Sequence, residues 1–230
     1  MIKRNDEGQK DARRIEEQTR GQSGNHLWDE EREWRLTASR FGAICKATER
    51  RNMLILAKSI LKPPKLKGDA VLHGLMQEEN AAKKFSELTG LKVKPCGLFI
   101  DEELSYLAAS PDGLVGQDED SLLEIKSPYT QRNSKIDKAY LFPFLEDKNG
   151  ELKLKRNHDF FFQIQGQLHI CKKKVCYFVV YTFIDVHIEK IEADSQFFAE
   201  KMLPHLSNFW KTHYLPCIMQ DLVPEEHDNL

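Results

Sequence analysis

The sequence predicts an α/β domain in which a mixed central sheet is flanked by helices. Residues 69–89, closed by Gly90, repeat apolar side chains at helical spacing. Residues 175–183 form a continuous apolar run, which is typical of a strand covered on both faces. Between them, residues 92–126 alternate like short strands separated by turn residues. A chain that combines both periods needs a sheet with helices packed against it.

The length and composition favour one folded domain. With 230 residues and 40% hydrophobic side chains, the chain can bury one sizeable core. The 34 Lys and Arg nearly balance 36 Asp and Glu, so the net charge of −2 does not by itself indicate a nucleic-acid binder, although a local basic groove stays compatible with it. We expect residues 1–26 to be a flexible N-terminal arm, residues 27–215 the folded domain and residues 216–230 a C-terminal tail.

The five cysteines and the lengths of the apolar runs argue against a zinc or iron–sulfur protein and against a membrane-spanning protein. No cysteine pair has the CxxC spacing of common zinc or iron–sulfur sites, so we expect reduced, mostly buried thiols. No apolar run approaches the ~20 residues that span a bilayer. We therefore expect no membrane association and a soluble, intracellular protein, in the cytoplasm or the nucleus.

The helix predicted at residues 69–89 carries an unusual acidic residue. The apolar positions on its inward face are Val71, Leu75, Ala82 and Phe85. Glu78 falls on the same stripe, whereas Glu79 is turned away by about 100°. A carboxylate on such a stripe needs a metal ion or a lysine as partner. The alternative is a glutamate at the edge of the stripe that reaches water.

The other elements follow from the same patterns. Strands are predicted at residues 92–100, 104–109, 113–116, 121–126, 175–183 and, at the sheet edge, 186–191. Helices are predicted at residues 131–140, 158–171 and from Asp194 onward, the last one kinked near Pro204. Residues 141–156 are predicted to form an inserted loop or ribbon.

The residues that point to chemistry lie on a predicted hairpin. Ser110-Pro111-Asp112-Gly113 is followed by Glu124-Ile125-Lys126. Strand alternation places Glu124 and Lys126 on one face, about 7 Å apart. The hairpin can return Asp112 beside Glu124, so that two carboxylates meet at one point, as Mg²⁺ requires.

Lys126 has a physical role beside such a site. Its charge can hold and polarise a water that attacks a phosphodiester, while the metal stabilises the developing negative charge. The alternative is a surface hairpin whose Glu124 and Lys126 form a solvated ion pair, worth about 0–1 kcal/mol.

Five blocks of sequence resemble a known family. They are SPDGL at 110–114, LLEIKSPYTQR at 122–132, WDEEREWRLTASRFG at 28–42, HGLMQEENAAKKF at 73–85 and QIQGQL at 163–168. Together they resemble the YqaJ-type viral recombinases, the branch of the PD-(D/E)XK nucleases that includes phage lambda exonuclease. The resemblance spans residues 28–183 and implies a restriction-endonuclease-like core.

The resemblance implies roles for individual residues. Asp112 and Glu124 match the metal-binding carboxylates, and Lys126 matches the catalytic lysine. The remaining matches are Glu78 as the acidic residue of the preceding helix, the Ile125 carbonyl as a further metal ligand and Gln163 as the glutamine that closes the active site.

Three further residues match positions that contact DNA. Arg32 and Ser39 match residues that contact a 5′ phosphate in the lambda-like enzymes, and Arg132 matches a contact to the DNA backbone. A cation and a hydroxyl at a helix start can cradle a phosphate. The alternatives are an exposed helix charge for Arg32 and a simple helix cap for Ser39.

The implied activity is a Mg²⁺-dependent DNA exonuclease, with Mn²⁺ as a substitute, that digests duplex ends 5′ to 3′ for recombination and repair. The resemblance also implies a homo-oligomer, a ring-shaped trimer, and a single-strand annealing protein as partner. Alternatives are a structure-specific or nicking endonuclease of the same fold, or a non-catalytic DNA-binding protein. Residues 141–156 depart from the phage enzymes, and their KLKR run either extends the DNA channel or is a solvated ribbon.

Overall fold

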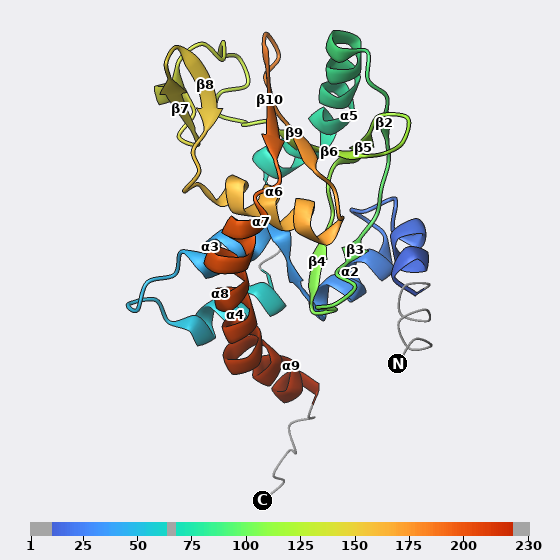
Figure 1. Cartoon of the computed structure of the whole chain (residues 1–230), viewed down its shortest axis with the longest axis vertical. Helices are drawn as coiled ribbons and strands as arrows, with labels where there is room; N and C mark the ends of the chain where they lie inside the picture. The colour runs from blue at the N-terminus through green and yellow to red at the C-terminus, as the bar shows by residue number, and fades with distance from the viewer. Residues whose placement is uncertain (1–10, 64–67, 223–230) are drawn as a thin grey trace, which may run out of the picture.

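The computed structural model describes residues 11–63 and 68–222. Its centre is a five-stranded sheet in the order β10-β9-β6-β5-β2 (Figure 1). The strands are β2 (Val93–Lys94), β5 (Gly113–Val115), β6 (Ser121–Lys126), β9 (Val175–Tyr181) and β10 (Val186–Glu192). The pair β6 and β9 is parallel, and the other neighbours are antiparallel. The predicted mixed α/β fold is confirmed, and β10 is the predicted edge strand.

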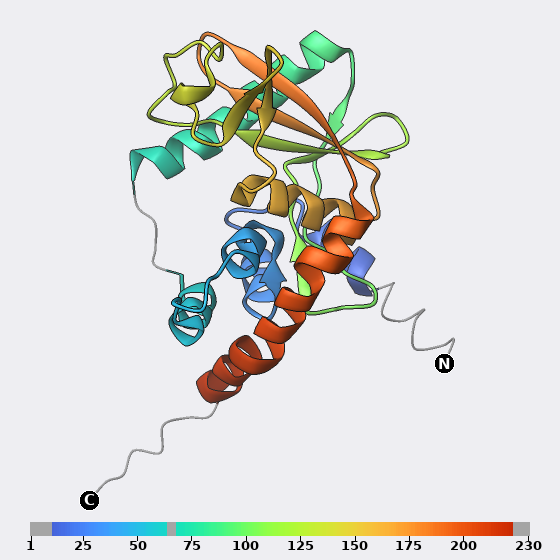
Figure 2. The same ribbon diagram turned by 60° about the vertical axis from the view of Figure 1, so that its left-hand side comes forward.

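Two helices cover the faces of this sheet. Figure 2 shows α5 (Asp69–Thr89) on one side and α6 (Asp159–Ile170) on the other. The two-residue period of β6 divides its side chains between them: Ile125 packs in one core cluster with Phe85 of α5, and Leu122 packs in the larger cluster that includes α6. Glu124 therefore points from β6 toward α6.

The predicted bounds of α5 are confirmed, but its inward stripe is buried only in part. Phe85 is fully buried and Ala82 partly, whereas Leu75 is 43% exposed. The side chain of Val71 lies outside the description. Only the C-terminal half of α5 packs on the sheet, while Leu75 and Glu78 line an open cavity. The periodicity predicted one face correctly but not how far along the helix the sheet extends.

A smaller layer lies beyond α6. It contains a three-stranded sheet, β1 (Leu36–Thr37), β4 (Leu107–Ala109) and β3 (Phe99–Ile100), and the helical elements α2 (His26–Glu33), η1 (Ala38–Arg40), α3 (Phe41–Cys45) and α4 (Met53–Leu61). Gly166 of α6 lets this layer approach closely, because a Cβ there would lie 2.4 Å from the Phe41 ring. The predicted long strand at residues 92–100 is thus split between two sheets.

The inserted segment forms a hairpin at the β10 edge of the sheet (Figure 1). Its strands are β7 (Leu145–Lys148) and β8 (Glu151–Leu154), joined by Asn149 and Gly150 with φ of 57° and 85°. Two of the three cations of its KLKR run form ion pairs: Lys153 contacts Glu151 at 3.0 Å and Arg156 contacts Asp194 at 2.6 Å. The third, Lys155, donates to the Pro143 carbonyl at 2.7 Å. The geometry is that of the predicted ribbon.

The helix predicted at residues 131–140 is wrong. The structure has turns there and one 3-10 turn, η2 (Ala139–Leu141). The backbone groups of this segment bond to the β9–β10 loop instead: the Ile136 N–H donates to Asp185 Oδ2 at 2.8 Å, and the Arg132 carbonyl accepts from the Phe183 N–H at 2.7 Å. Tertiary hydrogen bonds replace the helical ones.

The C-terminal helix runs from Ser195 to Leu222. Two π-helical turns, η3 (Phe198–Met202) and η4 (Trp210–Tyr214), separate α7 (Ser195–Phe197), α8 (Leu203–Phe209) and α9 (Leu215–Leu222). Each π turn ends just before a Leu-Pro pair, where proline lacks the N–H of a regular turn. The expected tail from residue 216 is wrong as far as residue 222, because Cys217 and Ile218 are buried.

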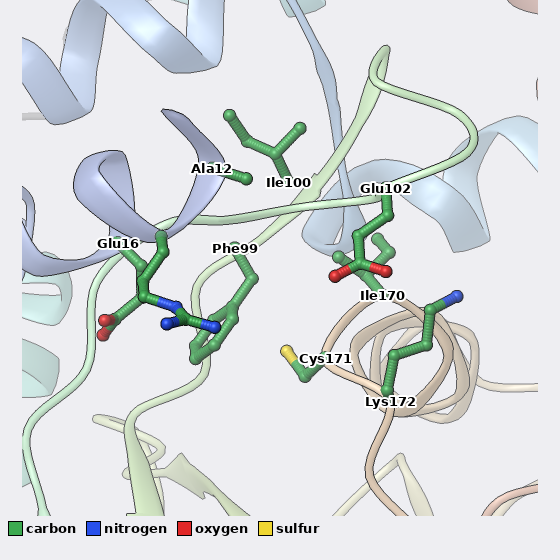
Figure 3. Close-up of a pocket in the computed structure, with 9 residues that line it drawn as sticks. Ala12, Glu16, Phe99, Ile100, Glu102, Ile170, Cys171 and Lys172 are labelled. Carbon is green, nitrogen blue, oxygen red and sulfur yellow. The ribbon is translucent and has the colours of Figure 1, made fainter. Parts of the chain in front are cut away.

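The expected flexible arm is also wrong for residues 11–26; residues 1–10 lie outside the description. Residues 11–18 are helical and dock against the layer around β3, where Ala12 and Glu16 lie near Phe99 (Figure 3). Glu16 Oε1 accepts from the Gly97 N–H at 3.0 Å, and the wholly buried Thr19 accepts from the Leu98 N–H at 2.8 Å. Buried hydrogen bonds hold a segment that has few large apolar residues.

Two expectations from composition can be compared with the described residues. All five cysteines are free and four are buried, which confirms the predicted reduced thiols. Within residues 11–63 and 68–222, none of the helices combines the length and apolar character that crossing a membrane requires.

Candidate active site

The β5–β6 hairpin brings Asp112 beside Glu124. Gly113 pairs with Leu123 across the hairpin, and the Asp112 N–H donates to the Leu123 carbonyl at 3.0 Å. In return, Asp112 Oδ2 accepts from the Ile125 N–H at 2.6 Å. Both ends of Asp112 are therefore tied to β6, as the sequence pattern predicted. Ile125 lies between Glu124 and Lys126 with its side chain on the α5 face.

Glu124 is a buried carboxylate whose two oxygens are both hydrogen-bonded. Its side chain is 1% exposed. Oε1 accepts from Lys126 Nζ and from Gln163 Nε2, the latter at 2.7 Å, and Oε2 accepts from Gln167 Nε2 at 2.6 Å. The two glutamines stand four residues apart on α6, so both reach the same carboxylate. These donors compensate the cost of burying its charge.

Lys126 is held as a cation. Burial lowers the pKa of Lys126, but the charges of Glu124 and Asp112 outweigh it and raise the pKa above its ordinary value. The ammonium also lies 4.7 Å from the centroid of the Phe160 ring, which favours the positive form. At neutral pH this side chain is therefore a proton donor and a fixed positive charge.

The negative charge of Glu124 acts on two nearby carboxylates, those of Glu78 and Asp112. Burial, and after it the charge of Glu124, raises the pKa of Glu78 and raises that of Asp112 well above its ordinary value, although Lys126 opposes both shifts. Three carboxylates face one ammonium, so their ionised forms repel one another. A divalent cation would relieve that repulsion.

The donor set suits a hard divalent cation, since its carboxylates offer oxygen ligands. Within the described ranges, however, no three His, Cys, Asp or Glu side chains are already arranged to hold a metal ion. Both oxygens of Glu124 accept N–H donors in this structure. Among the described residues, Oε2 accepts a hydrogen bond only from Gln167, and so keeps a lone pair with which it could bind an ion.

A cavity of about 520 Å³ opens on one side of this cluster. It is lined by Arg20, Gly21, Gln22, Ser23, Trp28, Leu75, Glu78, Pro95, Cys96 and Asp112. Glu78 and Asp112 reach it from two different elements. A second cavity of about 270 Å³, between residues 12–16 and β3, contains none of the predicted site residues in its lining (Figure 3).

Arg32 packs against Trp28, which lines the first cavity. Its guanidinium carbon is 3.7 Å from the Trp28 ring centroid, and Trp28 Nε1 donates to Ser110 Oγ at 2.9 Å. Burial lowers the pKa of Arg32 to about 10, and Arg40 adds to the decrease while Asp29 opposes it. Arg32 therefore stays cationic at neutral pH in a partly desolvated position.

The neighbouring residues form a basic cavity. Three arginines, Arg32, Arg35 and Arg40, line about 360 Å³ of space together with Thr37 and two acidic residues, Asp29 and Glu33. Ser39 lies beside it on η1, exposed, with its hydroxyl 3.3 Å from Thr37 Oγ1. The structure thus brings Arg32 and the Ser39 turn to one place, as the resemblance implied.

Arg132 has contacts within its own turn. It donates to the Tyr129 carbonyl at 2.7 Å and stacks on the Tyr129 ring at 4.2 Å. That ring packs edge-on against His73 of α5 at 5.5 Å. Arg132 is therefore fixed near α5 by these contacts, and a role in contacting DNA stays a prediction.

Sequence reasoning missed two glutamines. Gln167 contacts Glu124 directly, and its i+4 spacing from Gln163 is the signal in the sequence that could have identified it. Gln22 lines the cavity from a segment expected to be mobile, and its polar surroundings gave no signal.

Known proteins resemble this chain over most of its length. The model of the family described as the YqaJ-like viral recombinase domain matches residues 27–174. The alkaline nuclease of Orgyia pseudotsugata multicapsid polyhedrosis virus is 28% identical over an alignment of 187 residues that covers 73% of this chain and 42% of the relative. The chain therefore spans less than half the length of that relative.

Solved structures match over most of the chain. The alkaline exonuclease LHK-Exo from Laribacter hongkongensis is 26% identical, with a TM-score of 0.61 over 85% of this chain and 98% of that chain. LHK-Exo in complex with dAMP has the same identity and a TM-score of 0.64, over 85% of this chain and 94% of that chain. The resemblance seen in the sequence blocks is confirmed, and the chain belongs to the YqaJ-like viral recombinase domain family.

Proposed function

We propose that this protein is a divalent-metal-dependent deoxyribonuclease that hydrolyses phosphodiester bonds at the Asp112–Glu124–Lys126 site. The observation that carries the proposal is the meeting of an acidic hairpin, the half-buried Glu78 of α5 and a protonated lysine in one partly buried cluster. The match to LHK-Exo, described as an alkaline exonuclease, supports this chemistry.

Mg²⁺ is the proposed ion, with Mn²⁺ as a substitute. Asp112, Glu124, Glu78 and the Ile125 carbonyl would hold it. When bound, the ion supplies Lewis-acid stabilisation of the negative charge that develops on the scissile phosphate. Gln163 and Gln167 keep Glu124 oriented by donating to its two oxygens.

Lys126 acts as the fixed cation beside the attacked phosphate. Its ammonium would position the attacking water and stabilise the negative charge of the phosphate, because its raised pKa keeps it protonated at neutral pH. The proton of that water would pass to Glu78, a carboxylate of raised pKa that lines the open cavity beside Asp112. Lys126 does not serve as the base in this protonation state. The Phe160 ring beneath it keeps the ammonium in place.

The substrate we propose is a DNA duplex end with a 5′ phosphate. Arg32, Arg40 and the Ser39 turn surround a basic space next to Trp28, whose ring also lines the catalytic cavity. A phosphate in that space would place the adjoining nucleotide toward Asp112. The LHK-Exo complex with dAMP supports a mononucleotide-binding fold. Digestion would run 5′ to 3′; a trimeric ring and an annealing partner stay predictions.

The test uses the purified chain with Mg²⁺ and linear duplexes that bear or lack a 5′ phosphate. We expect nucleotide release from the phosphorylated ends, strongly reduced in Lys126→Ala and Asp112→Asn. An Arg32→Ala variant should lose the preference for the phosphorylated end, and equal use of both ends by the wild type would contradict that assignment. Equal activity of wild type and Lys126→Ala would contradict the mechanism.

Closed circular DNA separates the alternatives. An end-dependent exonuclease leaves it intact, whereas a nicking or structure-specific endonuclease of the same fold cuts it. DNA binding without metal-dependent release of nucleotides would indicate a non-catalytic DNA-binding protein.

A further inference from the structure

Gln22 forms two hydrogen bonds at the edge of the catalytic cavity. Its Nε2 donates to the Pro111 carbonyl at 2.8 Å and to the Cys96 carbonyl at 2.9 Å. Both bonds span more than seventy residues of sequence, so they join the N-terminal segment (residues 11–25) to the body of the protein. Because Pro111 directly precedes Asp112, one of the two bonds acts on the loop that presents the carboxylate.

Asp112 itself is tied to β6, but residues 110 and 111, which lead into it, lie between strands β4 and β5. Only from Gly113 does the chain enter β5. Before it, Trp28 Nε1 donates to Ser110 Oγ, and the Pro111 carbonyl accepts from Gln22 Nε2 at 2.8 Å and from the Cys96 thiol at 3.2 Å. A shift of this loop would move the Asp112 oxygen that accepts from Ile125, and with it the carboxylate that faces Glu78 and Glu124.

The position of Gln22 is itself determined by several contacts. Its φ of 44° lies in the left-handed region, which residues other than glycine adopt only where the surroundings impose it. The Gln22 N–H donates to the Thr19 carbonyl at 2.8 Å, and Thr19 is wholly buried. Asn25 donates to the Gln18 carbonyl at 2.7 Å on the other side of the turn. The turn therefore presents the carboxamide in one place.

We propose that Gln22 is a positioning residue of the metal site, and that the N-terminal segment is part of the catalytic unit although it lies outside the matched residues 27–174. Gln22 fixes the Asp112 loop through Pro111, much as Gln163 and Gln167 fix Glu124. This inference rests on the proposed function, because the atom that Gln22 positions is a proposed metal ligand.

The test compares Gln22→Ala and Gln22→Glu with Gln18→Ala. Glutamate has the same size as glutamine, but its carboxylate cannot donate to the two carbonyls. Gln18 is exposed on the same segment, and the bond that its backbone carbonyl accepts survives the change to alanine. The probe is Mn²⁺ titrated into the apo protein by calorimetry.

We expect both Gln22 variants to bind Mn²⁺ about 10-fold more weakly than the wild type, the lower end of the effect of removing a residue that orients a metal ligand. Their kcat on linear duplexes should fall by about the same factor with KM for DNA unchanged. Gln18→Ala should match the wild type. Mn²⁺ affinity and kcat of the Gln22 variants equal to those of Gln18→Ala would overturn the inference.

Amide hydrogen exchange separates positioning from general destabilisation. Loss of the Gln22 hydrogen bonds to Cys96 and Pro111 should speed exchange at the Asp112 and Ile125 amides, while the amides of β9 and β10 should still exchange slowly. Faster exchange throughout the sheet, or a failure of both variants to fold, would assign Gln22 a purely structural role.

The same experiments distinguish the inference from the proposed function. A wild type that binds no Mn²⁺, or binds it as well after Asp112→Asn, overturns the proposed metal site. The exchange rates at Asp112 and Ile125 still decide whether Gln22 braces the loop.

Discussion

The two halves of the catalytic cluster differ in how their charges are compensated. On the α6 side, Glu124 is almost fully buried, and three N–H donors occupy its oxygens. On the cavity side, Glu78 and Asp112 have raised pKa values, chiefly through burial and the nearby Glu124. One half is organised before any ligand arrives, whereas in the other half the ionised carboxylates repel each other, and an added cation would relieve that repulsion. Hydrogen bonds thus fix Glu124 and Lys126, whereas the repulsion between the charges of Glu78 and Asp112 is left for a metal ion to relieve.

Removing the cation of the organised half should have the largest effect. Lys126→Ala leaves the backbone intact but removes the positive charge nearest to Glu124, and we expect kcat to fall by about 10²–10³-fold, as for loss of one preorganised donor. Single-turnover cleavage of a linear duplex measures it. Lys84→Ala, an exposed lysine on α5, is the control and should retain wild-type rates.

Supplying a cation to the cavity half should stabilise the fold. At a free Mg²⁺ concentration about 100 times its Kd, linkage adds about 2.7 kcal/mol to the free energy of unfolding. Urea unfolding with and without Mg²⁺ measures this difference. We expect Asp112→Asn to abolish the increment; an equal increment in that variant would locate the ion elsewhere.

Weakening the support of Glu124 should cost stability even without metal. Gln167→Ala leaves one oxygen of a buried carboxylate without its amide donor, and we expect the free energy of unfolding to fall by about 1–3 kcal/mol. Chemical denaturation in the absence of divalent ions tests this. The exposed Gln196→Ala on the C-terminal helix should change stability little. A Gln167→Ala variant as stable as the wild type would show that Glu124 finds another donor.

Asp101, a buried carboxylate outside the catalytic cluster, shows the opposite pKa shift to that of Asp112. Burial would raise the pKa of Asp101, but His169, the Leu104 and Glu103 N–H groups and Lys172 together lower it to about 2 from 3.8. A lowered folded-state pKa stabilises the fold above pH ~3.8, and that stability is lost as the pH falls toward 2. The shift corresponds to about 2 kcal/mol at neutral pH.

Urea unfolding of the wild type and Asp101→Asn from pH 7 to pH 3 checks this. The difference in stability should be largest at pH 7 and shrink as the solution is acidified. A difference that grows with acid would contradict the assignment and would suggest that Asp101 behaves like Asp112.

Local sequence patterns predicted the site correctly where strand or helix periodicity alone determines the direction of a functional side chain. The alternation of Leu122, Glu124 and Lys126 placed the carboxylate and the ammonium on one face of β6, and the structure retains that arrangement. The bounds of α5 and the inward position of Glu78 relative to Glu79 followed from a helical period. Such features depend on backbone geometry within a few residues, which the sequence specifies directly.

Patterns failed where backbone groups bond to distant partners. The segment 131–140 is not helical because its N–H and carbonyl groups bond to the loop at residues 183–185. Residues 11–25 are docked because Glu16, Thr19 and Gln22 satisfy backbone groups of residues 96–98 and 111. Neither pairing can be recognised in the local sequence, because the same polar residue can bond to water or to a buried amide.

By itself, the sequence determined the family blocks, the α/β class and the hairpin that pairs Asp112 with Glu124. Only the tertiary structure decided that Gln163 and Gln167 share one carboxylate, that half of the α5 stripe faces a cavity, and that Gln22 supports the Asp112 loop. The reason is physical: periodicity fixes which way a side chain points, whereas burial, pKa and hydrogen-bond partners depend on which distant segments fold against it.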